Sequence, residues 1–250
     1  DDAYGVVVGD VDHREVFRLA ERYYGKLKPR ALPERKPQRE PEQQGVRRLT
    51  VKAPADLPVV LLAFKAPTLR DVERDSDPYA LEMLSAILDG HDAARFTKNL
   101  VRSQRLAVSA GAGYDATARG PGLFYLSASP SAGHTVAELE TALRAEVARI
   151  AEAGVTPEEL ERATAPLVAG GLYKLDSMFA QAMEIGQLEA VGIAHGKGKR
   201  LIEKLQQVSA EQVQAVAARY FGDDGLTVGV LDPQPLPDAP RRPQAPAGRH

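Results

Sequence analysis

The sequence of 250 residues contains no cysteine. Disulfide bonds, thiolate nucleophiles and zinc sites built on thiolates are therefore excluded, because each of them requires cysteine sulfur. Chains without cysteine occur both in the reducing cytosol and in the oxidising periplasm, so this absence does not assign a compartment.

Neither sign of charge dominates, and long hydrophobic runs are missing. The 32 lysines and arginines against 34 aspartates and glutamates give a net charge of −2, so the chain lacks the basic surface typical of nucleic-acid or membrane-surface binding. No apolar stretch reaches the ~18 residues of a membrane-spanning helix. We therefore predict neither a nucleic-acid partner nor a membrane span. The chain is nevertheless long enough to bury a sizeable core.

Sequence signatures of catalysis are missing as well. The chain contains neither H-E-x-x-H nor H-x-x-E-H, no G-x-S-x-G elbow, and no glycine-rich phosphate loop of the G-x-G-x-x-G or G-x-x-x-x-G-K-[ST] type. No two histidines have the spacing of one helical face. The five histidines are His13, His91, His134, His195 and His250. We predict no catalytic residue and no metal ligand in this chain.

Both ends of the chain carry a related segment. DDAYGVVVGD at residues 1–10 and DDGLTVGVLD at residues 223–232 share three aspartates and two valines at a constant offset of 222. An offset about one domain long indicates a structural repeat. The helices within 11–25 and 208–222 also look alike, but their offset of 197 differs, and shared capping rules explain that likeness. Because the first residue is Asp and no signal peptide is visible, we expect further sequence upstream.

Composition divides the chain into four segments. Residues 1–28 predict a buried strand at 4–9 and a helix capped by Asp12 and ended by Gly25. Residues 29–46 hold four prolines and many charges, which predict an extended linker. We predict one larger folded unit over residues 47–232. The proline-rich residues 233–250 are predicted to form a disordered tail.

The larger unit alternates between strand and helix signals. Strands are expected at 47–54, 57–67, 105–115, 122–130 and 226–232. A helix from Asp77 to Gly90 has Asp77 as its expected N-cap and Pro78 in its first turn. Residues 94–104 are expected to continue helically. Later helices are expected after Thr135 and Thr156, over 170–193 as one long glycine-interrupted helix, and after Ser209.

Several of these segments together carry a family resemblance. They are VVVGDVD with its helix, ALEMLSAILDG, RLAVSAGAGYD, RGPGLFYLSASP, and GVTPEELERA with LVAGGLYKLDSMFAQAMEIGQLEA. Over residues 1–232 the chain resembles bacterial members of the pitrilysin/insulinase family of zinc peptidases, relatives of the mitochondrial processing peptidases. The resemblance implies an α+β fold, a mostly antiparallel sheet covered by helices, forming one half of a two-domain clamshell. Residues 1–28 would then be the terminal strand and helix of a missing first half, which accounts for the repeat.

The resemblance also implies a function. The chain would be the C-terminal half of a zinc-dependent endopeptidase, walling the peptide-binding chamber and supporting the catalytic half. Zinc and its H-x-x-E-H motif would lie in the missing N-terminal half, leaving this chain without a cofactor and inactive by itself. The implied partners are that N-terminal catalytic domain or a partner subunit, and a peptide substrate; the implied location is periplasmic or otherwise extracytoplasmic. The alternative is an inactive pseudo-peptidase subunit acting as a binding or assembly scaffold.

Two arginines are the candidate substrate contacts. Arg102 and Arg105 lie just before or at the start of the strand at 105–115, where a guanidinium could bind a carboxylate or a peptide carbonyl; an ordinary exposed helix end is the alternative. Active family members place an arginine and, seven residues on, a tyrosine near the catalytic site. The matching positions here are Val101 and Val108, whose apolar side chains can replace neither the arginine nor the tyrosine. Arg102 is one residue away from the position of the arginine.

Overall fold

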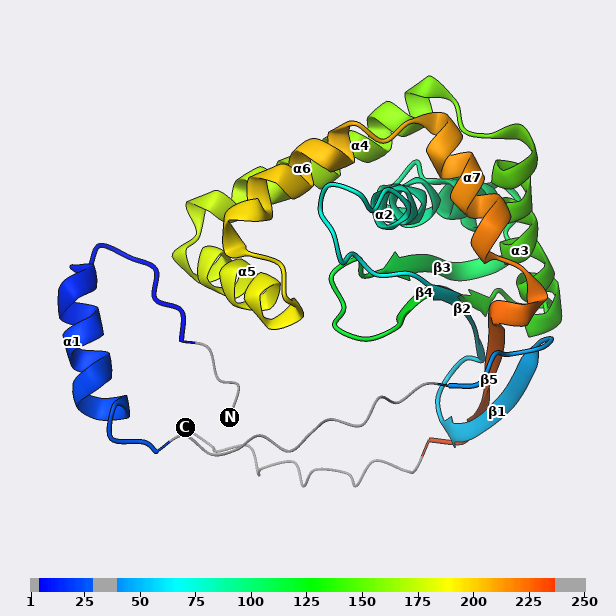
Figure 1. The fold of residues 1–250 in the computed structure, drawn as a ribbon. Coiled ribbons are helices and arrows are strands. Elements are labelled where there is room, and N and C mark those ends of the chain that lie inside the picture. Colours follow the sequence, from blue (N-terminus) through cyan, green and yellow to red (C-terminus); the bar gives the residue numbers. More distant parts are fainter. Residues whose placement is uncertain (1–4, 29–39, 237–250) are drawn as a thin grey trace, which may run out of the picture.

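A computed structural model describes residues 5–28 and 40–236. Its centre is a five-stranded sheet with the order β1-β5-β2-β4-β3 (Figure 1). β1 pairs with β5 in parallel, and the other neighbours pair antiparallel. The mostly antiparallel α+β fold expected from the sequence is therefore confirmed. The strands are β1 (Arg47–Pro54), β2 (Val59–Ala66), β3 (Ala107–Tyr114), β4 (Gly122–Pro130) and β5 (Leu226–Gln234).

Helices cover one face of this sheet. Figure 1 shows α2, α3 and α7 lying over the strands, whereas α4, α5 and α6 extend sideways as a separate layer, with α1 apart from both. The helices are α1 (His13–Tyr24), α2 (Asp77–Asp89), α3 (Val136–Ala153), α4 (Pro157–Tyr173), α5 (Met178–Val191), α6 (Gly198–Gln206) and α7 (Ala210–Tyr220). The π-helix η1 (Phe96–Ser103) and the 3-10 turns η2 (Lys174–Asp176), η3 (His195–Lys197) and η4 (Asp223–Gly225) complete the elements.

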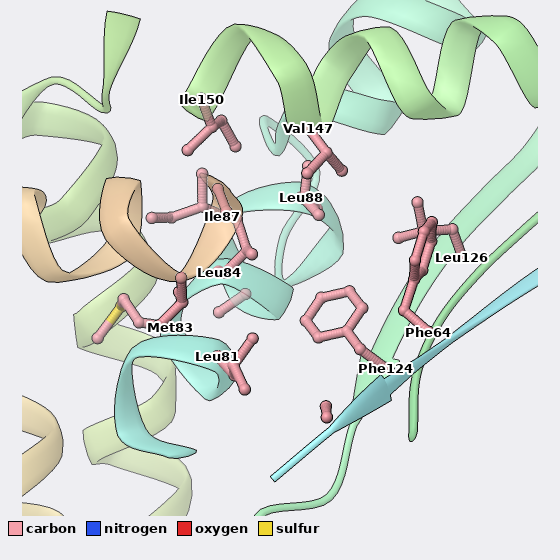
Figure 2. Packing of buried hydrophobic residues seen from close by; sticks show 14 of the residues in the cluster. Phe64, Leu81, Met83, Leu84, Ile87, Leu88, Phe124, Leu126, Val147 and Ile150 are labelled. Carbon is pink, nitrogen blue, oxygen red and sulfur yellow. The ribbon is translucent and has the colours of Figure 1, made fainter. Parts of the chain in front are cut away.

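The core lies between the sheet and these helices because the strands bury alternate side chains. Phe64 of β2 and Phe124 of β4 point to the helical side and are almost fully buried. Both rings contact Phe221, with centroids 4.8 and 4.9 Å apart. Leu81, Leu84 and other apolar residues of α2 pack over them (Figure 2). This one-sided burial is typical of antiparallel sheets and fixes which strand residues face away from the helices.

Helix starts follow the capping signals in the sequence. Thr135 and Glu138 form a reciprocal capping box at α3, and Ser209 forms one with Gln212 at α7. At α4 the backbone N–H of Thr156 donates to Glu159 at 3.0 Å. Each box satisfies backbone donors that the first helical turn leaves unpaired. The expected starts of these three helices are confirmed.

Three expected helices differ from the structure. The long helix expected over 170–193 is wrong: α4 ends at Tyr173, η2 interrupts the chain, and Ser177 caps a new helix by accepting a hydrogen bond from the Ala180 N–H at 3.2 Å. The N-cap of α2 is Ser76 rather than Asp77; the Asp77 carboxylate instead accepts hydrogen bonds from Arg219 and the Tyr220 hydroxyl, both at 2.5 Å. The continuation after α2 is a π-helix, not an α-helix.

In the N-terminal segment the structure confirms the expected helix but not the expected strand. Asp12 accepts a hydrogen bond from the Arg14 N–H at 2.8 Å, and Gly25 ends α1, as expected. Residues 5–9 are not assigned to a strand; within the described chain, β1 to β5 pair only with one another. α1 buries none of its side chains, and Phe17 is 71% exposed. That residues 1–28 belong to a preceding domain stays a prediction, and the expected linker and tail lie partly outside the described residues.

Candidate functional site

The two predicted substrate contacts lie on one exposed corner. Arg102 is in the last turn of η1, and Arg105 follows in the connection to β3. Arg105 has a positive φ of 54°, which turns the chain sharply into the strand, and the Ser131 hydroxyl donates to its carbonyl. Both guanidinium groups are exposed and are not paired with a described carboxylate. The structure therefore leaves both side chains available at the surface without placing either in a cavity described below.

The two valines that match the family's arginine and tyrosine have separate environments. Val101 packs partly against the core, whereas Val108 on the edge strand β3 is 51% exposed. Neither apolar side chain donates or accepts a hydrogen bond. These positions supply packing rather than polar chemistry.

The histidines are dispersed over the described chain. His13 lies on α1, His91 after α2, His134 before α3, and His195 in η3; His250 lies outside the described residues. His91 accepts a hydrogen bond from the Ala93 N–H at 3.1 Å, and His195 pairs with Glu189 at 2.7 Å. Among the residues that the structure describes, no three histidines or carboxylates are close enough to hold a metal ion. The described residues therefore do not fit a zinc site.

A cavity of about 470 Å³ opens between α2, α4, α5, α6 and the loop that follows β3. Its walls are mostly apolar, with a polar end formed by α2, the loop and η2. The apolar lining includes Leu69, Leu167, Leu188, Leu201, Ile202 and Leu205. The polar lining includes Tyr79, Glu82, Tyr114, Asp115, Lys174 and Glu184. The sequence analysis did not single out this cavity, because its residues come from distant parts of the chain.

Glu82 is the distinctive group of this cavity. It lies on α2 between the fully buried Leu81 and Met83 and lines the cavity together with Asp115 and Ala116 of the loop that follows β3. Burial raises the pKa of Glu82 to about 7; the negative charge of Asp115 adds to this shift, whereas the Ala116 backbone amide and Lys174 oppose it. A carboxyl group in this state changes its charge near neutral pH.

Two tyrosines fix the polar end of the cavity. The Tyr79 hydroxyl donates to the Val72 carbonyl at 3.0 Å, and the Tyr114 hydroxyl donates to the Pro67 carbonyl. Burial is the main cause of the raised pKa of both phenols, which for Tyr79 is about 12. Both hydroxyl groups thus stay protonated at neutral pH and are already used as donors.

Glycines allow the helices around the cavity to come close. A Cβ added at Gly171 of α4 would lie 2.7 Å from Ile202 Cδ1, and one at Gly198 would lie 2.6 Å from Glu184 Oε1. A Cβ at Gly170 would meet no atom within 4 Å. Two of the three glycines therefore mark close packing, and Gly170 marks open space on the lining.

A second, more polar cavity of about 360 Å³ lies beside η1, α3 and α4. Glu146 is fully buried and accepts hydrogen bonds from Asn99 at 3.0 and 3.1 Å, besides its ion pair with Arg149. Arg95 donates twice to Glu159 at 2.8 Å. Because each of these carboxylates is paired, we assign the groups a structural role in joining η1 to α3 and α4.

Comparison with known proteins identifies the family. Residues 1–167, two thirds of the chain, match the family model of the Peptidase M16 inactive domain. The chain belongs to this family of peptidase-like domains, which confirms the resemblance to the C-terminal half of such zinc peptidases.

Individual relatives agree with this assignment. An uncharacterized zinc protease of Rickettsia bellii is 25% identical over 234 residues, which cover 93% of this chain and 54% of that protein. A protease from Helicobacter pylori has a similar fold, with a TM-score of 0.79, 23% identity, and coverage of 90% of this chain and 54% of that one. The periplasmic protease PqqL from Escherichia coli gives a TM-score of 0.73 at 13% identity, covering 90% of this chain and 26% of that one. The chain thus spans about half the length of the curated relative it matches.

None of the described helices combines the length and the apolar character needed to cross a bilayer.

Proposed function

We propose that this chain is the non-catalytic second half of a zinc-dependent endopeptidase, where it walls a peptide-binding chamber and supports the catalytic half. The observation that carries the proposal is the match to an inactive peptidase domain. Zinc would belong to the missing half, where it would activate a water molecule for peptide hydrolysis.

The uncovered face of the sheet supports the need for a partner domain. Leu61 of β2 and Tyr125 of β4 are 42% and 47% exposed, and Leu49, Val51 and Leu123 are similarly exposed. A sheet face with several exposed apolar side chains is typical of an interaction surface. α1 has no fully buried side chain, and its Phe17 and Tyr23 are 71% and 65% exposed, so these large side chains lack the apolar contact that normally stabilises a helix.

Arg102 and Arg105 are the proposed substrate contacts of this half. Their exposed guanidinium groups can bind a peptide carbonyl or a terminal carboxylate. A periplasmic location is also proposed, supported by the shared fold of the periplasmic E. coli protease.

A pseudo-peptidase scaffold is the second candidate function. It is favoured by Val101 and Val108, which stand where active relatives are expected to carry an arginine and a tyrosine. In that case the chain would bind or assemble with a partner without contributing to hydrolysis.

The experiment uses the full-length protein, its first half and the 250-residue chain. Zinc content and hydrolysis of a casein-derived peptide are measured for each, and for the two halves mixed. We expect zinc only in proteins with the first half, and hydrolysis only when both halves are present. Stoichiometric zinc with peptide turnover in the 250-residue chain alone would overturn the proposal. A full-length protein without H-x-x-E-H and without turnover would favour the scaffold.

A further inference from the structure

We propose that the 470 Å³ cavity between α2, α4, α5 and α6 binds the cationic side chain of a peptide, lysine or arginine, with its charged end beside Glu82. The inference rests on the proposed function, because it names the class of peptide side chain that this chamber wall would hold. It requires three properties of the cavity: an acidic end, an apolar wall and enough room.

Acidic side chains outnumber basic ones at the polar end. Glu82, Asp115 and Glu184 line the cavity together with a single described cation, Lys174. Lys174 is exposed and forms no ion pair with Glu82 among the described residues. One oxygen of Asp115 accepts hydrogen bonds from the Thr117 N–H and hydroxyl, both at 2.9 Å. The carboxyl group of Glu82 is partly buried and forms no ion pair among the described residues, which leaves a place for a cation from outside.

The rest of the cavity suits the stem of a long side chain. Leu69 and the α6 residues Leu201, Ile202 and Leu205 form an apolar wall along it. Lysine and arginine bury their methylene groups on apolar surface while their charged ends reach a polar group. A volume of about 470 Å³ lies within the range of small-ligand sites.

Other ligand classes fit less well. An anionic side chain would meet three carboxylates, and like charges at close range repel. A purely apolar side chain would displace water from Glu82 without giving it a partner, which costs free energy. The cation alone satisfies both the acidic end and the apolar wall.

Binding should also depend on pH, because the cation needs an ionised Glu82. The charged and titratable groups that act on Glu82 from the surrounding elements are Asp115, Lys174 and Tyr114, and Tyr79 and Glu184 line the same cavity. Both tyrosines stay protonated at neutral pH, so Glu82 dominates the response in this range. We expect the affinity for an arginine peptide to increase several-fold from pH 6 to pH 8.

The test compares peptides that differ only in charge. Binding of a blocked alanine pentapeptide with a central arginine to the 250-residue chain is measured by calorimetry against the same peptide with citrulline, which has a similar shape but no charge. We expect the arginine peptide to bind at least about tenfold more tightly. Glu82→Gln should remove this preference, whereas Glu152→Gln, which removes an exposed carboxylate outside the cavity, should keep it.

A second variant tests the cavity independently of charge. Gly170→Leu should fill the open space at α4 and abolish binding, with an unchanged circular dichroism spectrum. Equal binding of the two peptides, or a preference that survives both Glu82→Gln and Gly170→Leu, would overturn the inference. Binding of butylguanidine without any binding of the arginine peptide would also overturn it. If the arginine peptide binds as expected while the full-length protein hydrolyses nothing, the inference stands and the proposed peptidase function falls.

Discussion

Glu82 should make the stability of this protein depend on pH in a way that one substitution removes. Its pKa is about 7 in the folded protein, against 4.5 for an ordinary glutamate. The folded state therefore holds the proton to higher pH than the unfolded chain does. The stability contributed by the neutral carboxyl is complete below pH 4.5 and is lost as the pH rises to about 7.

The size of this loss follows from the two pKa values. Each pH unit between them changes the free energy of unfolding by about 1.36 kcal/mol, which gives a loss of roughly 3 kcal/mol for the wild type. The causes of the shift are burial first, then repulsion from Asp115, partly offset by Lys174 and the Ala116 amide. Glu82→Gln keeps the shape and the hydrogen-bonding capacity of the side chain but carries no charge, so it should escape this loss.

Urea unfolding followed by circular dichroism measures the effect. Wild type, Glu82→Gln and Glu152→Gln are compared at pH 4.5, 5.5, 6.5 and 8, so that contributions from the many other carboxyl groups cancel between variants. The difference in free energy of unfolding between Glu82→Gln and wild type should change with pH. From pH 4.5 to pH 8 we expect it to shift by roughly 3 kcal/mol in favour of Glu82→Gln. Glu152→Gln should follow the wild type throughout. A Glu82→Gln curve parallel to that of the wild type would refute the reasoning, because Glu82 would then be solvated like a surface carboxylate.

Three further predictions concern the fold. Thr135→Ala removes the capping box of α3 and should lower the free energy of unfolding by about 1 kcal/mol in urea titrations; an unchanged midpoint would contradict the capping role. Leu84→Ala creates a cavity in the core and should lower the free energy of unfolding by about 3 kcal/mol. Leu61 is half-exposed, so Leu61→Ala should lower it much less. Similar losses of stability for both variants would contradict the assignment of the core. Limited proteolysis followed by mass spectrometry should cut first within 29–46 or after 232, while a first cut inside 135–190 would contradict the proposed division of the chain.

Local signals account for the parts of the fold that the sequence predicted well. Thr135 and Ser209 each stand three residues before a glutamate or glutamine, and the capping boxes form where this spacing occurs. Burial alternates along β4 as a half-buried strand requires, with Phe124, Leu126 and Ala128 facing the core. Such patterns depend on neighbours a few residues apart, so the chain alone reveals them.

The elements that were not predicted depend on contacts between distant segments. α6 follows glycines and lysines that favour a loop, yet Leu201, Ile202 and Leu205 form one apolar face that packs towards α4. The interruption at η2 depends on Ser177, which the sequence alone does not distinguish from other serines. Local patterns thus missed both features of the α4–α6 layer.

The candidate site was harder to predict from the sequence than the helices and strands were. ALEMLSAILDG predicts a buried helix, and Glu82 within it is a single polar position that could face solvent, a partner or a cavity. Only the three-dimensional arrangement decides between these, because it brings α4, α5, α6 and the loop after β3 to the cavity that Glu82 lines. Arg102 and Arg105 were singled out from the sequence, and their role as substrate contacts stays a prediction.

The strand order has a consequence for how the chain is synthesised. β1 is the first strand of the sheet, yet its only neighbour among the described residues is β5, which ends the described fold. During translation, residues 47–54 therefore have no partner until residues 226–234 have left the ribosome, and β2 also lacks one of its two neighbours until then. A nascent chain stopped anywhere before residue 226 exposes two unpaired strand edges, which are prone to association with other chains. Within the described residues, the strand that comes last in the sequence is thus the one that joins β1 to the rest of the sheet.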